Sequence, residues 1–520
     1  MHEEAPAQPG PSAARTIALA AALIAVGNVA SRLLGLVREA VIARSFGRNV
    51  DAFTAASAIP TIIYDLLVNG AISAALVPVL SEYAEGDPDE FWRVASTIIN
   101  LALLLVAAVV GLLIWQAQPA VALLAGGFDA AIRAEATSMV RLLLPAVIFM
   151  GLSGLITAIL YARQRFLLPA FTTSAYNAGI IAAALLLTPA LGPFSLVAGV
   201  LLGAALQVLL QLPGLRGMRY RPVLDLRHPG VQRILLLYGP VALGIGFSVA
   251  GIVLDRNLAS RVGGNALTIM RYATTLIQFP LGLVATAVSF AVLPTLSRQA
   301  SAGDDEAFRR TLAMGIKVVL LLIVPATLGL AALATPLTAA LFERGKFGAG
   351  DTAAVARALL LYLPGLPAAA IDQMLLFAFY AHKRTLAPNL VQGGAVLIYA
   401  ATAFGLLALN LGVGALILGN SAQWVGHMLI LLVLSRGLVS LRGVRLGEAL
   451  LKSLLAGLAM AAVVWWLAGA LASVGGPLLQ LALAGSAGAA IYLGLSALLR
   501  VEALWFFFTA LLRRLRPGRT

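Results

Sequence analysis

Several charged side chains interrupt the long apolar segments of this chain, and their chemistry suggests what they bind. The basic ones are Arg32, Arg38, Arg141, Arg256, Arg271 and Arg357, and the acidic ones are Glu39, Asp65, Asp255 and Asp372. A charge at membrane depth is costly, so it usually faces a water-filled cavity or a partner. In a low dielectric the planar arginine fork suits phosphate through paired, charge-assisted bonds. The set favours an anion-binding cavity, although any single residue could instead form an ion pair between helices or reach the interface.

These charges lie on polar stripes of helical segments. Ser31 and Arg38 are seven residues apart, as are Arg32 and Glu39, so each pair shares one face of a helix. The other stripes are Thr61, Asp65, Asn69 and Ser73; Gly244, Ser248, Gly251 and Asp255; and Arg271, Thr275, Gln278, Gly282 and Ser289. Helix packing through small residues explains the glycines and hydroxyls, but it does not explain the arginines. We therefore expect a central cavity with a cationic floor, which suits a diphosphate better than a cation or a neutral solute.

The elements that carry these stripes are long apolar helices. The chain is 61% hydrophobic and 11% charged, with a mean hydropathy of +0.95, whereas a soluble domain is about half apolar and about a quarter charged. A spanning helix needs about 20 residues. We predict an all-α polytopic membrane protein with about fourteen transmembrane helices. They cover residues 16–44, 52–81, 93–116, 137–160, 168–189, 192–212, 234–260, 266–297, 311–333, 352–379, 386–408, 412–435, 449–470 and 477–499.

The distribution of basic residues predicts the topology. Most of the 36 lysines and arginines lie in segments that share one side of the membrane with both termini, which makes that side cytoplasmic. The net charge of +14 then reflects topology and contact with membrane lipids, and no nucleic-acid partner is expected. The chain has no cysteine, and its four histidines form no ligand pair at helical spacing, so we expect no disulfide and no metal site.

An internal repeat organises the chain. At a shift of 216 residues, Gly35 matches Gly251, Glu39 matches Asp255 and Arg141 matches Arg357, and at 219 residues 161–165 match 380–384. Six helices separate the copies, so the repeats are parallel. We predict a disordered cytoplasmic tail (1–14), an N-lobe (15–215), a basic cytoplasmic loop (216–233), a C-lobe (234–436), two further helices (437–500) and a basic cytoplasmic tail (501–520). The two six-helix repeats form two lobes around the central cavity.

The residues from Ser31 to Ala40, followed by Phe46-Gly47, Asp51-Ala52-Phe53, Ile59-Pro60, Gly70-Ala71 and Val77-Pro78, resemble the N-terminal signature of the MurJ/MviN lipid II flippases. The similarity continues through Tyr238-Gly239-Pro240, Phe279-Pro280, Leu293-Pro294 and Gly345-Lys346-Phe347. It implies fourteen helices in two lobes around a cationic cavity. It also implies export of an undecaprenyl-diphosphate-linked peptidoglycan precursor across the plasma (inner) membrane. The implied mechanism is alternating access driven by membrane potential or by a sodium or proton gradient, with no cofactor.

The resemblance also assigns roles to single residues. Arg32 and Arg38 match the first-helix arginines that the family needs, and Asp51 matches its acid at the start of helix two. Tyr64 and Asp65 stand where the family has two arginines, and Thr274 and Thr275 stand where it has an acid–arginine pair. Arg271 and Arg256 are candidates to replace the missing charge, and Asp255 is a candidate cation site. The expected diphosphate ligands are Arg32, Arg38, Arg271 and Arg256, and the expected polar lining is Ser31, Glu39, Asp51, Asp65, Asn69, Thr275 and Gln278.

Other function classes stay open at this point. The altered cavity also fits a flippase for another polyprenyl-diphosphate glycan, of the capsule or O-antigen type. A multidrug antiporter is disfavoured because its cargo is usually cationic. An enzyme is disfavoured because no paired loop carboxylates appear on an outside face, and an ATP-driven pump because no phosphate-binding P-loop pattern appears. We expect a transporter that works as a monomer and associates with the cell-wall synthesis machinery.

Overall fold

A computed structural model describes residues 11–69, 75–384, 386–441 and 443–506, and every regular element in this part of the chain is a helix. The chain folds into two compact units. The N-unit comprises residues 1–42, 52–123 and 129–245, and the C-unit comprises 43–51, 124–128 and 246–520. Helix α11 (Pro229–Val262) begins in the first unit and ends in the second. The finer boundaries predicted for the lobes and tails stay predictions, except that residues 11–14, expected in the tail, form the first turn of α1.

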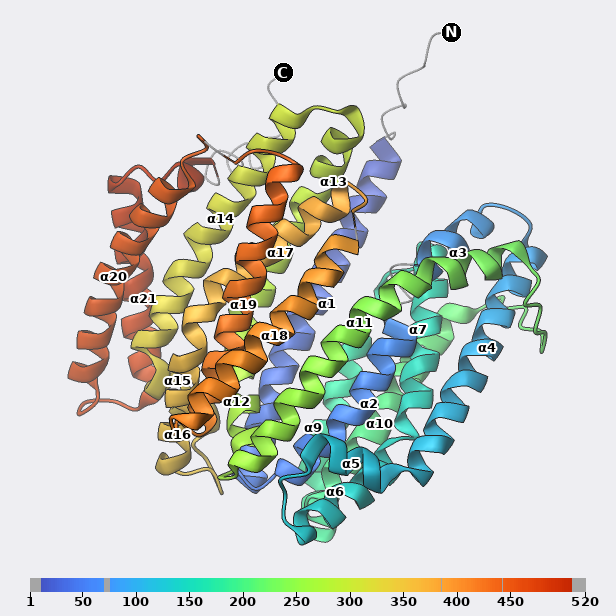
Figure 1. Ribbon diagram of the computed structural model, residues 1–520, viewed down its shortest axis with the longest axis horizontal. Coiled ribbons are helices and arrows are strands. Elements are labelled where there is room, and N and C mark those ends of the chain that lie inside the picture. Colours follow the sequence, from blue (N-terminus) through green and yellow to red (C-terminus); the bar gives the residue numbers. More distant parts are fainter. Residues whose placement is uncertain (1–10, 70–74, 385, 442, 507–520) are drawn as a thin grey trace. The chain divides into compact units, whose positions relative to one another are not determined.

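The N-unit holds the first half of the helices (Figure 1). In chain order they are α1 (Pro11–Phe46), α2 (Asp51–Tyr64), the π-helix η1 (Asp65–Asn69), α3 (Val77–Ala84), α4 (Pro88–Trp115), α5 (Ala117–Ala125), α6 (Ala130–Leu143), α7 (Ala146–Ala162), α8 (Leu167–Ala170), α9 (Thr172–Leu191), α10 (Phe194–Gln211) and the 3-10 helix η3 (Leu212–Leu215). The last residues of α1 and of α5 belong to the C-unit.

The C-unit holds the second half. Its helices are α12 (Ala266–Pro280), the π-helix η4 (Leu281–Ala285), α13 (Thr286–Ala302), α14 (Asp305–Ala332), α15 (Ala334–Phe342), α16 (Ala349–Tyr362), the 3-10 helix η5 (Leu363–Gly365), α17 (Leu366–Ala381), α18 (Leu386–Ala408), α19 (Val413–Leu434), the 3-10 helix η6 (Ser435–Gly437), α20 (Leu446–Leu471) and α21 (Pro477–Leu498). Figure 1 shows α20 and α21 beside α14, and α14 packs against α20, which packs against α21.

Aspartate side chains start several of these helices. Asp87 accepts a hydrogen bond from the Asp89 N–H at the start of α4, and Asp304 accepts one from the Ala307 N–H at the start of α14, both over 2.9 Å. Such caps satisfy amide donors that the first turn leaves unpaired, and a carboxylate also suits the positive end of the helix dipole. These caps fix where α4 and α14, each of 28 residues, begin.

Glycine allows close packing inside the N-unit. A Cβ on Gly179 of α9 would lie 2.5 Å from backbone of Gly203 on α10, which is closer than real Cβ atoms approach backbone. The two helices therefore approach through their glycines, as small residues permit in membrane helices. This contact fixes α9, which carries a residue of the candidate site.

The predicted spans fall on helices or on consecutive helices. Within the described residues, nine helices are long and apolar enough to cross a membrane, and up to eleven if two bent pairs each form one span. Others are divided by short breaks, because η1 follows α2 and η4 follows α12 in the second and eighth predicted spans. The all-helical membrane architecture is confirmed, and the number of fourteen stays a prediction.

The boundaries of the elements support the predicted repeat, which also stays a prediction. The π-helices η1 and η4 start at Asp65 and Leu281, which are 216 positions apart. Helices α4 and α14 start 217 positions apart and have the same length of 28 residues. A π-helix is rare and often lies at a functional position in a helix. Two π-helices separated by the same offset as the matching residues therefore favour the repeat.

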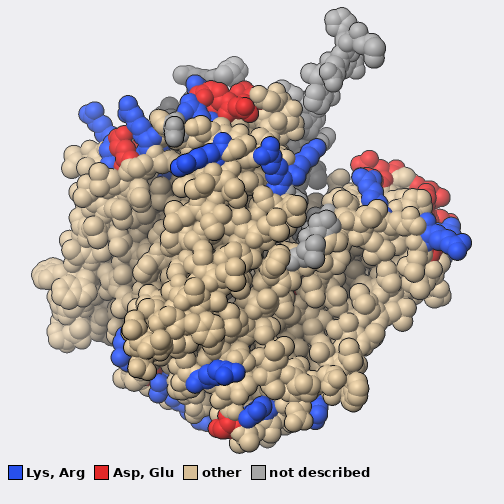
Figure 2. Space-filling view, in the orientation of Figure 1, with Lys and Arg blue, Asp and Glu red and all other residues tan. Residues whose placement is uncertain are grey.

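The loop at 216–233 differs from a simple lipid-facing basic segment. Arg219 lies 2.9 Å from Asp89, Arg93 lies 2.7 Å from Asp225 and Arg233 lies 2.6 Å from Glu82. Much of the charge is therefore paired with α3 and α4 inside the N-unit. For the residues described, Figure 2 shows charged side chains near the ends of helices and few along their sides, as expected of helices that lie in lipid.

Candidate functional site

Arg38 makes three side-chain hydrogen bonds inside the N-unit. Its Nε and Nη2 donate to Oε1 of Glu39 over 3.0 and 2.7 Å, and its Nη1 donates to Oδ1 of Asn177 over 2.9 Å. Glu39 is fully buried, whereas the Arg38 side chain keeps 25% of its surface exposed. The guanidinium has five N–H donors, and these bonds use three of them. Arg38 is thus held in place by its neighbours while part of its side chain stays accessible.

Asn177 joins Arg38 to the rest of α1. Its Nδ2 donates to the carbonyl oxygen of Ser31 over 3.0 Å, and only 3% of its surface is exposed. Ser31 itself donates to the Asn28 carbonyl oxygen over 2.9 Å. We did not predict Asn177 from the sequence, although a single asparagine in the apolar segment 168–189 was a signal. An amide in such a segment needs partners on a neighbouring helix, and here they lie on α1.

The other predicted residues of the N-unit lie on the same elements. Arg32 is partly exposed on α1, and Asp65 is partly buried at the start of η1. The side chain of Asn69 lies outside the described residues. Arg141, a basic residue at predicted membrane depth, is exposed and lines a pocket at α5 and α6. Within the N-unit the structure therefore joins Ser31, Arg38 and Glu39 through Asn177.

The C-unit holds a second charged group, around Asp255 of α11. The hydroxyl of Tyr399 donates to its Oδ1 over 2.7 Å, and the Asn420 amide donates to the same atom over 3.1 Å. These partners come from α18 and α19, and the sequence analysis identified neither of them. The phenol and the amide also carry oxygens of the kind that a hard cation accepts. The cation site predicted at Asp255 therefore stays a proposal with two further candidate ligands.

Arg256 of α11 lies near acidic side chains. It is close enough to Asp51 for an electrostatic interaction, and its Nε is buried with no hydrogen-bond partner in the described part of the chain. Asp51 is 9% exposed and accepts hydrogen bonds from both the backbone N–H and the hydroxyl of Thr268. Thr268 lies in the first turn of α12, so Asp51 caps that helix from another segment. Asp51 therefore holds α12 in place, and its buried carboxylate is not a prominent part of a cavity wall.

Helix α12 carries the remaining predicted residues. Arg271, Thr275 and Gln278 lie on it, and Gln278 is exposed while the other two are partly buried. The hydroxyl of Thr275 donates to the Arg271 carbonyl oxygen over 2.9 Å, and that of Thr274 does so over the same distance. The threonines at these positions therefore satisfy their hydroxyls within the helix and supply no charge.

The two arginines differ in the charges near them. Arg38 pairs with one buried acid, Glu39, and with the Asn177 amide. Arg256 is close enough to Asp51 for an electrostatic interaction and follows Asp255 in the chain, so Arg256 serves there as a counter-charge to acids. Of the four arginines predicted to bind a diphosphate, Arg256 is the one whose surroundings suit that role least.

An apolar cleft in the C-unit lies where α14 meets α20 and α21. Its volume is about 490 Å³, and small residues on two of the helices open it. Its walls include Pro325, Ala326 and Gly329 of α14, Met460 and Val464 of α20, and Gly485, Gly488, Ala489 and Tyr492 of α21. The Tyr492 hydroxyl donates a hydrogen bond to the Leu321 carbonyl oxygen over 2.8 Å. The cleft therefore presents hydrocarbon surface and suits a hydrocarbon chain.

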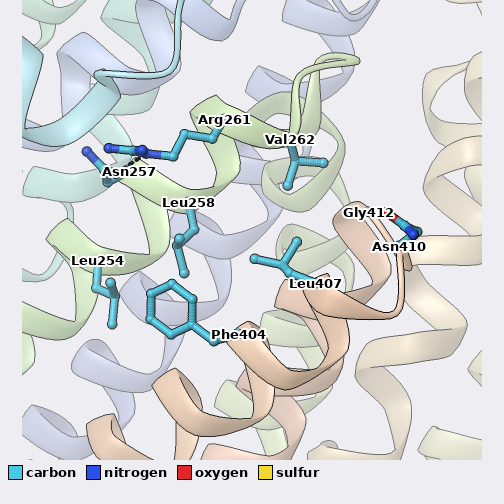
Figure 3. Close-up of a pocket in the computed structure, with 9 residues that line it drawn as sticks. All are labelled: Leu254, Asn257, Leu258, Arg261, Val262, Phe404, Leu407, Asn410 and Gly412. Carbon is cyan, nitrogen blue, oxygen red and sulfur yellow. Dashed lines mark hydrogen bonds between the residues drawn. The ribbon is translucent and has the colours of Figure 1, made fainter.

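A second pocket of the C-unit lies between the ends of α11 and α18 (Figure 3). Its volume is about 640 Å³. In Figure 3 Arg261 and Asn257 lie on one side, and Leu407 and Phe404 on another. The Arg261 Nε donates to Asn257 Oδ1 over 2.8 Å. The described lining supplies one engaged guanidinium, which is not the group of arginines expected for a diphosphate.

Comparison with known proteins identifies the family of this chain. The family model of the lipid II flippase MurJ matches residues 42–483. This chain belongs to the lipid II flippase MurJ family. The lipid II flippase MurJ of Burkholderia cenocepacia is 34% identical over 409 residues, which cover 74% of this chain and 79% of the relative. A probable lipid II flippase MurJ of Haemophilus influenzae is 31% identical over 464 residues, or 84% of this chain and 90% of the relative.

Solved structures support the same fold. A lipid II flippase MurJ in an inward closed conformation matches with a TM-score of 0.79 and 25% identity, over 92% of this chain and 98% of that one. An inward-facing multidrug resistance transporter of the MATE family and MOP superfamily matches with a TM-score of 0.67 at 14% identity, over 78% and 94% of the two chains. The second likeness is one of fold alone. The family resemblance predicted from the first-helix motif is confirmed.

Proposed function

We propose that this chain moves lipid II, an undecaprenyl-diphosphate-linked peptidoglycan precursor, from the inner to the outer face of the plasma membrane. The observation that carries the proposal is the geometry of Arg38. Its guanidinium is fixed by Glu39 and Asn177, yet the side chain as a whole keeps a quarter of its surface exposed. A cation held in place at low dielectric is suited to a diphosphate, because the cost of ordering the side chain has already been met.

The diphosphate enters from the cytoplasmic side and meets Arg32, Arg38 and Arg271, while Arg256 balances Asp51 and Asp255. The two lobes then rock and open the cavity to the outside. The polyprenyl chain stays in hydrocarbon, and the cleft beside α20 and α21 gives part of it a surface. Binding and release are non-covalent, so the chain acts as a transporter without a catalytic residue. It works as a monomer with cytoplasmic termini and associates with the cell-wall synthesis machinery.

A second cargo is favoured by a particular observation. The resemblance leads us to expect an acid–arginine pair on helix eight, and Thr274 and Thr275 stand there with their hydroxyls bonded to the helix backbone. A cavity with fewer charges could accept another polyprenyl-diphosphate glycan of the capsule or O-antigen type. Both cargoes share the diphosphate and differ in the sugar.

The test is rescue of cells depleted of their own lipid II flippase. The wild-type chain should restore peptidoglycan synthesis, Arg38→Ala should not, and Arg141→Ala, which removes an exposed arginine of the same unit, should behave as wild type. All three are compared at equal amounts in the membrane. Failure of the wild type at good expression would favour the second cargo. Rescue by Arg38→Ala would contradict the assigned site.

A further inference from the structure

Asp372 of α17 and His427 of α19 form a buried ionisable pair that the proposed cargo site does not use. The His427 Nδ1 lies 2.6 Å from Asp372 Oδ1, and the two side chains are 8% and 16% exposed. Both helices belong to candidate membrane spans, 349–381 and 413–437. An ionisable residue inside a membrane span is costly to retain and commonly marks an ion or proton pathway.

The number of protons on this pair determines its net charge. With one proton the pair is neutral overall, as an ion pair or as two uncharged side chains. With no proton it carries one negative charge, and with two protons one positive charge. A net charge in a low-dielectric interior is strongly disfavoured. The pair therefore keeps one proton while it is buried and releases it on contact with water that can solvate the charge.

The other ionisable groups around the pair do not supply a matching charge. Helix α17 packs against α13, α14 and α19. Tyr380, an uncharged phenol on α17, is close enough to Asp372 for an electrostatic interaction. The groups on neighbouring elements are engaged elsewhere or exposed: Lys317 of α14 with Glu502, Tyr399 of α18 with Asp255, Tyr362 of α16 near Asp255 and Arg256, and Arg298, Arg357 and Arg436 at exposed positions. For the side chains described, each of the two is thus the other's direct ionic partner.

One atom of the pair is unsatisfied in the described conformation. The Nε2 of His427 is buried and has no hydrogen-bond partner in the described part of the chain. A buried polar atom without a partner is unusual and costs about 1–3 kcal/mol. A conformation that gave Nε2 a water molecule would remove this cost and give the proton a route to water. A conformational change that exposes His427 Nε2 to water is therefore favourable for the pair.

The pair also lies in line with the Asp255 group. Asn420, which donates to Asp255, is seven residues before His427 on α19, so the two side chains share one face about 10 Å apart. A movement of α19 that exposes His427 also moves a partner of Asp255. Helix α19 therefore connects proton binding at His427 to the surroundings of Asp255.

We propose that Asp372 and His427 bind one proton, and that its uptake and release couple the proton gradient to the change between inward-open and outward-open states. The proposal rests on the proposed transport function. It adds the identity of the coupling ion and the residues that bind it. It does not depend on which lipid-linked glycan is carried.

The first test reads the proton directly. The chain has four histidines, so ¹⁵N-histidine spectra of the full protein in lipid nanodiscs can be assigned by single substitutions. We expect the ring-nitrogen signals of His427 to respond to pH as the pair binds and releases its proton, and Asp372→Asn to change this response. His427 signals that stay the same from pH 5 to pH 9 would overturn the proposal.

The second test reads the conformation without cargo. The chain has no cysteine, so spin labels can be placed at exposed Leu191 and Leu409, one in each unit. We expect the ratio of the two distance populations to change with pH, by at most about tenfold per pH unit for one proton. His427→Gln and Asp372→Asn should flatten this response, and His382→Gln, in a loop, should keep it. A pH-independent ratio in the wild type, or an unchanged response in both variants, would contradict the proposal.

Failure of the proposed function gives a different result. If the wild-type chain does not translocate lipid II but the label distances still respond to pH through His427, the cargo is wrong and the proton site stands. If lipid II is translocated and the distances ignore pH, the cargo stands and the proton site is wrong.

Discussion

Arg38 and Arg256 are both arginines at predicted membrane depth, yet their surroundings differ. Arg38 in the N-unit makes three hydrogen bonds, to one acid and one amide, and keeps part of its surface exposed. Arg256 in the C-unit has a buried Nε without a partner in the described residues and lies near two acids. An arginine that is held by neighbours and still reachable can bind a ligand. An arginine enclosed by carboxylates mainly balances their charge.

The comparison extends to the ions proposed to bind near them. Arg38 of the N-unit is proposed to bind the anionic cargo. The proposed cation ligand Asp255 and the proposed proton pair of Asp372 and His427 lie in the C-unit. A transporter can in this way bind its cargo and its coupling ion at separate places.

The largest expected effect is on transport by Arg38→Ala. Removing charge-assisted bonds worth about 3 kcal/mol corresponds to a loss of about 100-fold in the translocation rate. Arg38→Lys keeps the charge but not the fork, and we expect it to recover only part of the rate. The rate is measured with fluorescent lipid II in proteoliposomes, with Arg141→Ala as the control. A wild-type translocation rate for Arg38→Ala would contradict the assignment of Arg38 as a cargo ligand.

The next effect is on the stability of Arg256→Ala. Without this cation Asp51 and Asp255 lose a nearby counter-charge, and we expect a loss of about 2 kcal/mol in the free energy of unfolding. Thermal unfolding in detergent would show it as a lower Tm, and the double variant with Asp255→Asn should recover part of the loss. A variant as stable as the wild type, but defective in binding lipid II, would make Arg256 a cargo ligand and contradict the contrast with Arg38.

A smaller effect is expected for Asn177→Ala. This change removes the bond that orients Arg38 and the bond to the Ser31 carbonyl oxygen. We expect a loss of about tenfold in translocation, because one hydrogen bond to a charged group is worth about 1.5 kcal/mol. Asn420→Ala, which removes an amide from the Asp255 group, is the matched change in the C-unit, and it should leave lipid II binding intact. Equal losses of binding in both variants would mean that the two units are not specialised.

The smallest effect concerns pH. His382, in the loop between two spans, packs its ring on Phe308, and burial together with the nearby Arg384 lowers its pKa from the usual 6.5. The folded state then binds fewer protons than the unfolded state below that pH. His382 therefore leaves stability unchanged above about pH 6.5 and lowers it as the pH falls further. His382→Gln should make the Tm less sensitive to acid, whereas a steeper loss in that variant would contradict this assignment.

The sequence predicted the helices well because a run of about 20 apolar residues indicates a spanning helix. The breaks within these helices were harder to predict. The π-helix η1 begins at Asp65 inside an otherwise continuous apolar pattern, and hydropathy does not distinguish a π-helix from an α-helix. Motif resemblance located Arg32 and Arg38, because these charges stand out in an apolar segment.

Partners from distant helices could not be predicted in the same way. Asn177 contacts Arg38 across 139 positions of the sequence, and Asn420 contacts Asp255 across 165. A polar residue in an apolar segment indicates that a partner exists, but only the packing of helices identifies it. The proximity of Arg256 to Asp51 could not be predicted for the same reason, because the two residues lie far apart in the sequence.

The most direct measurement is the binding of lipid II to the purified wild-type chain, Arg38→Ala and Arg256→Ala in nanodiscs, with each variant first shown to be folded. We predict that Arg38→Ala weakens binding by about 100-fold, whereas a folded Arg256→Ala binds within about threefold of the wild type. If Arg256→Ala loses binding while Arg38→Ala keeps it, the cargo is held at Arg256 and the contrast between the two arginines is wrong.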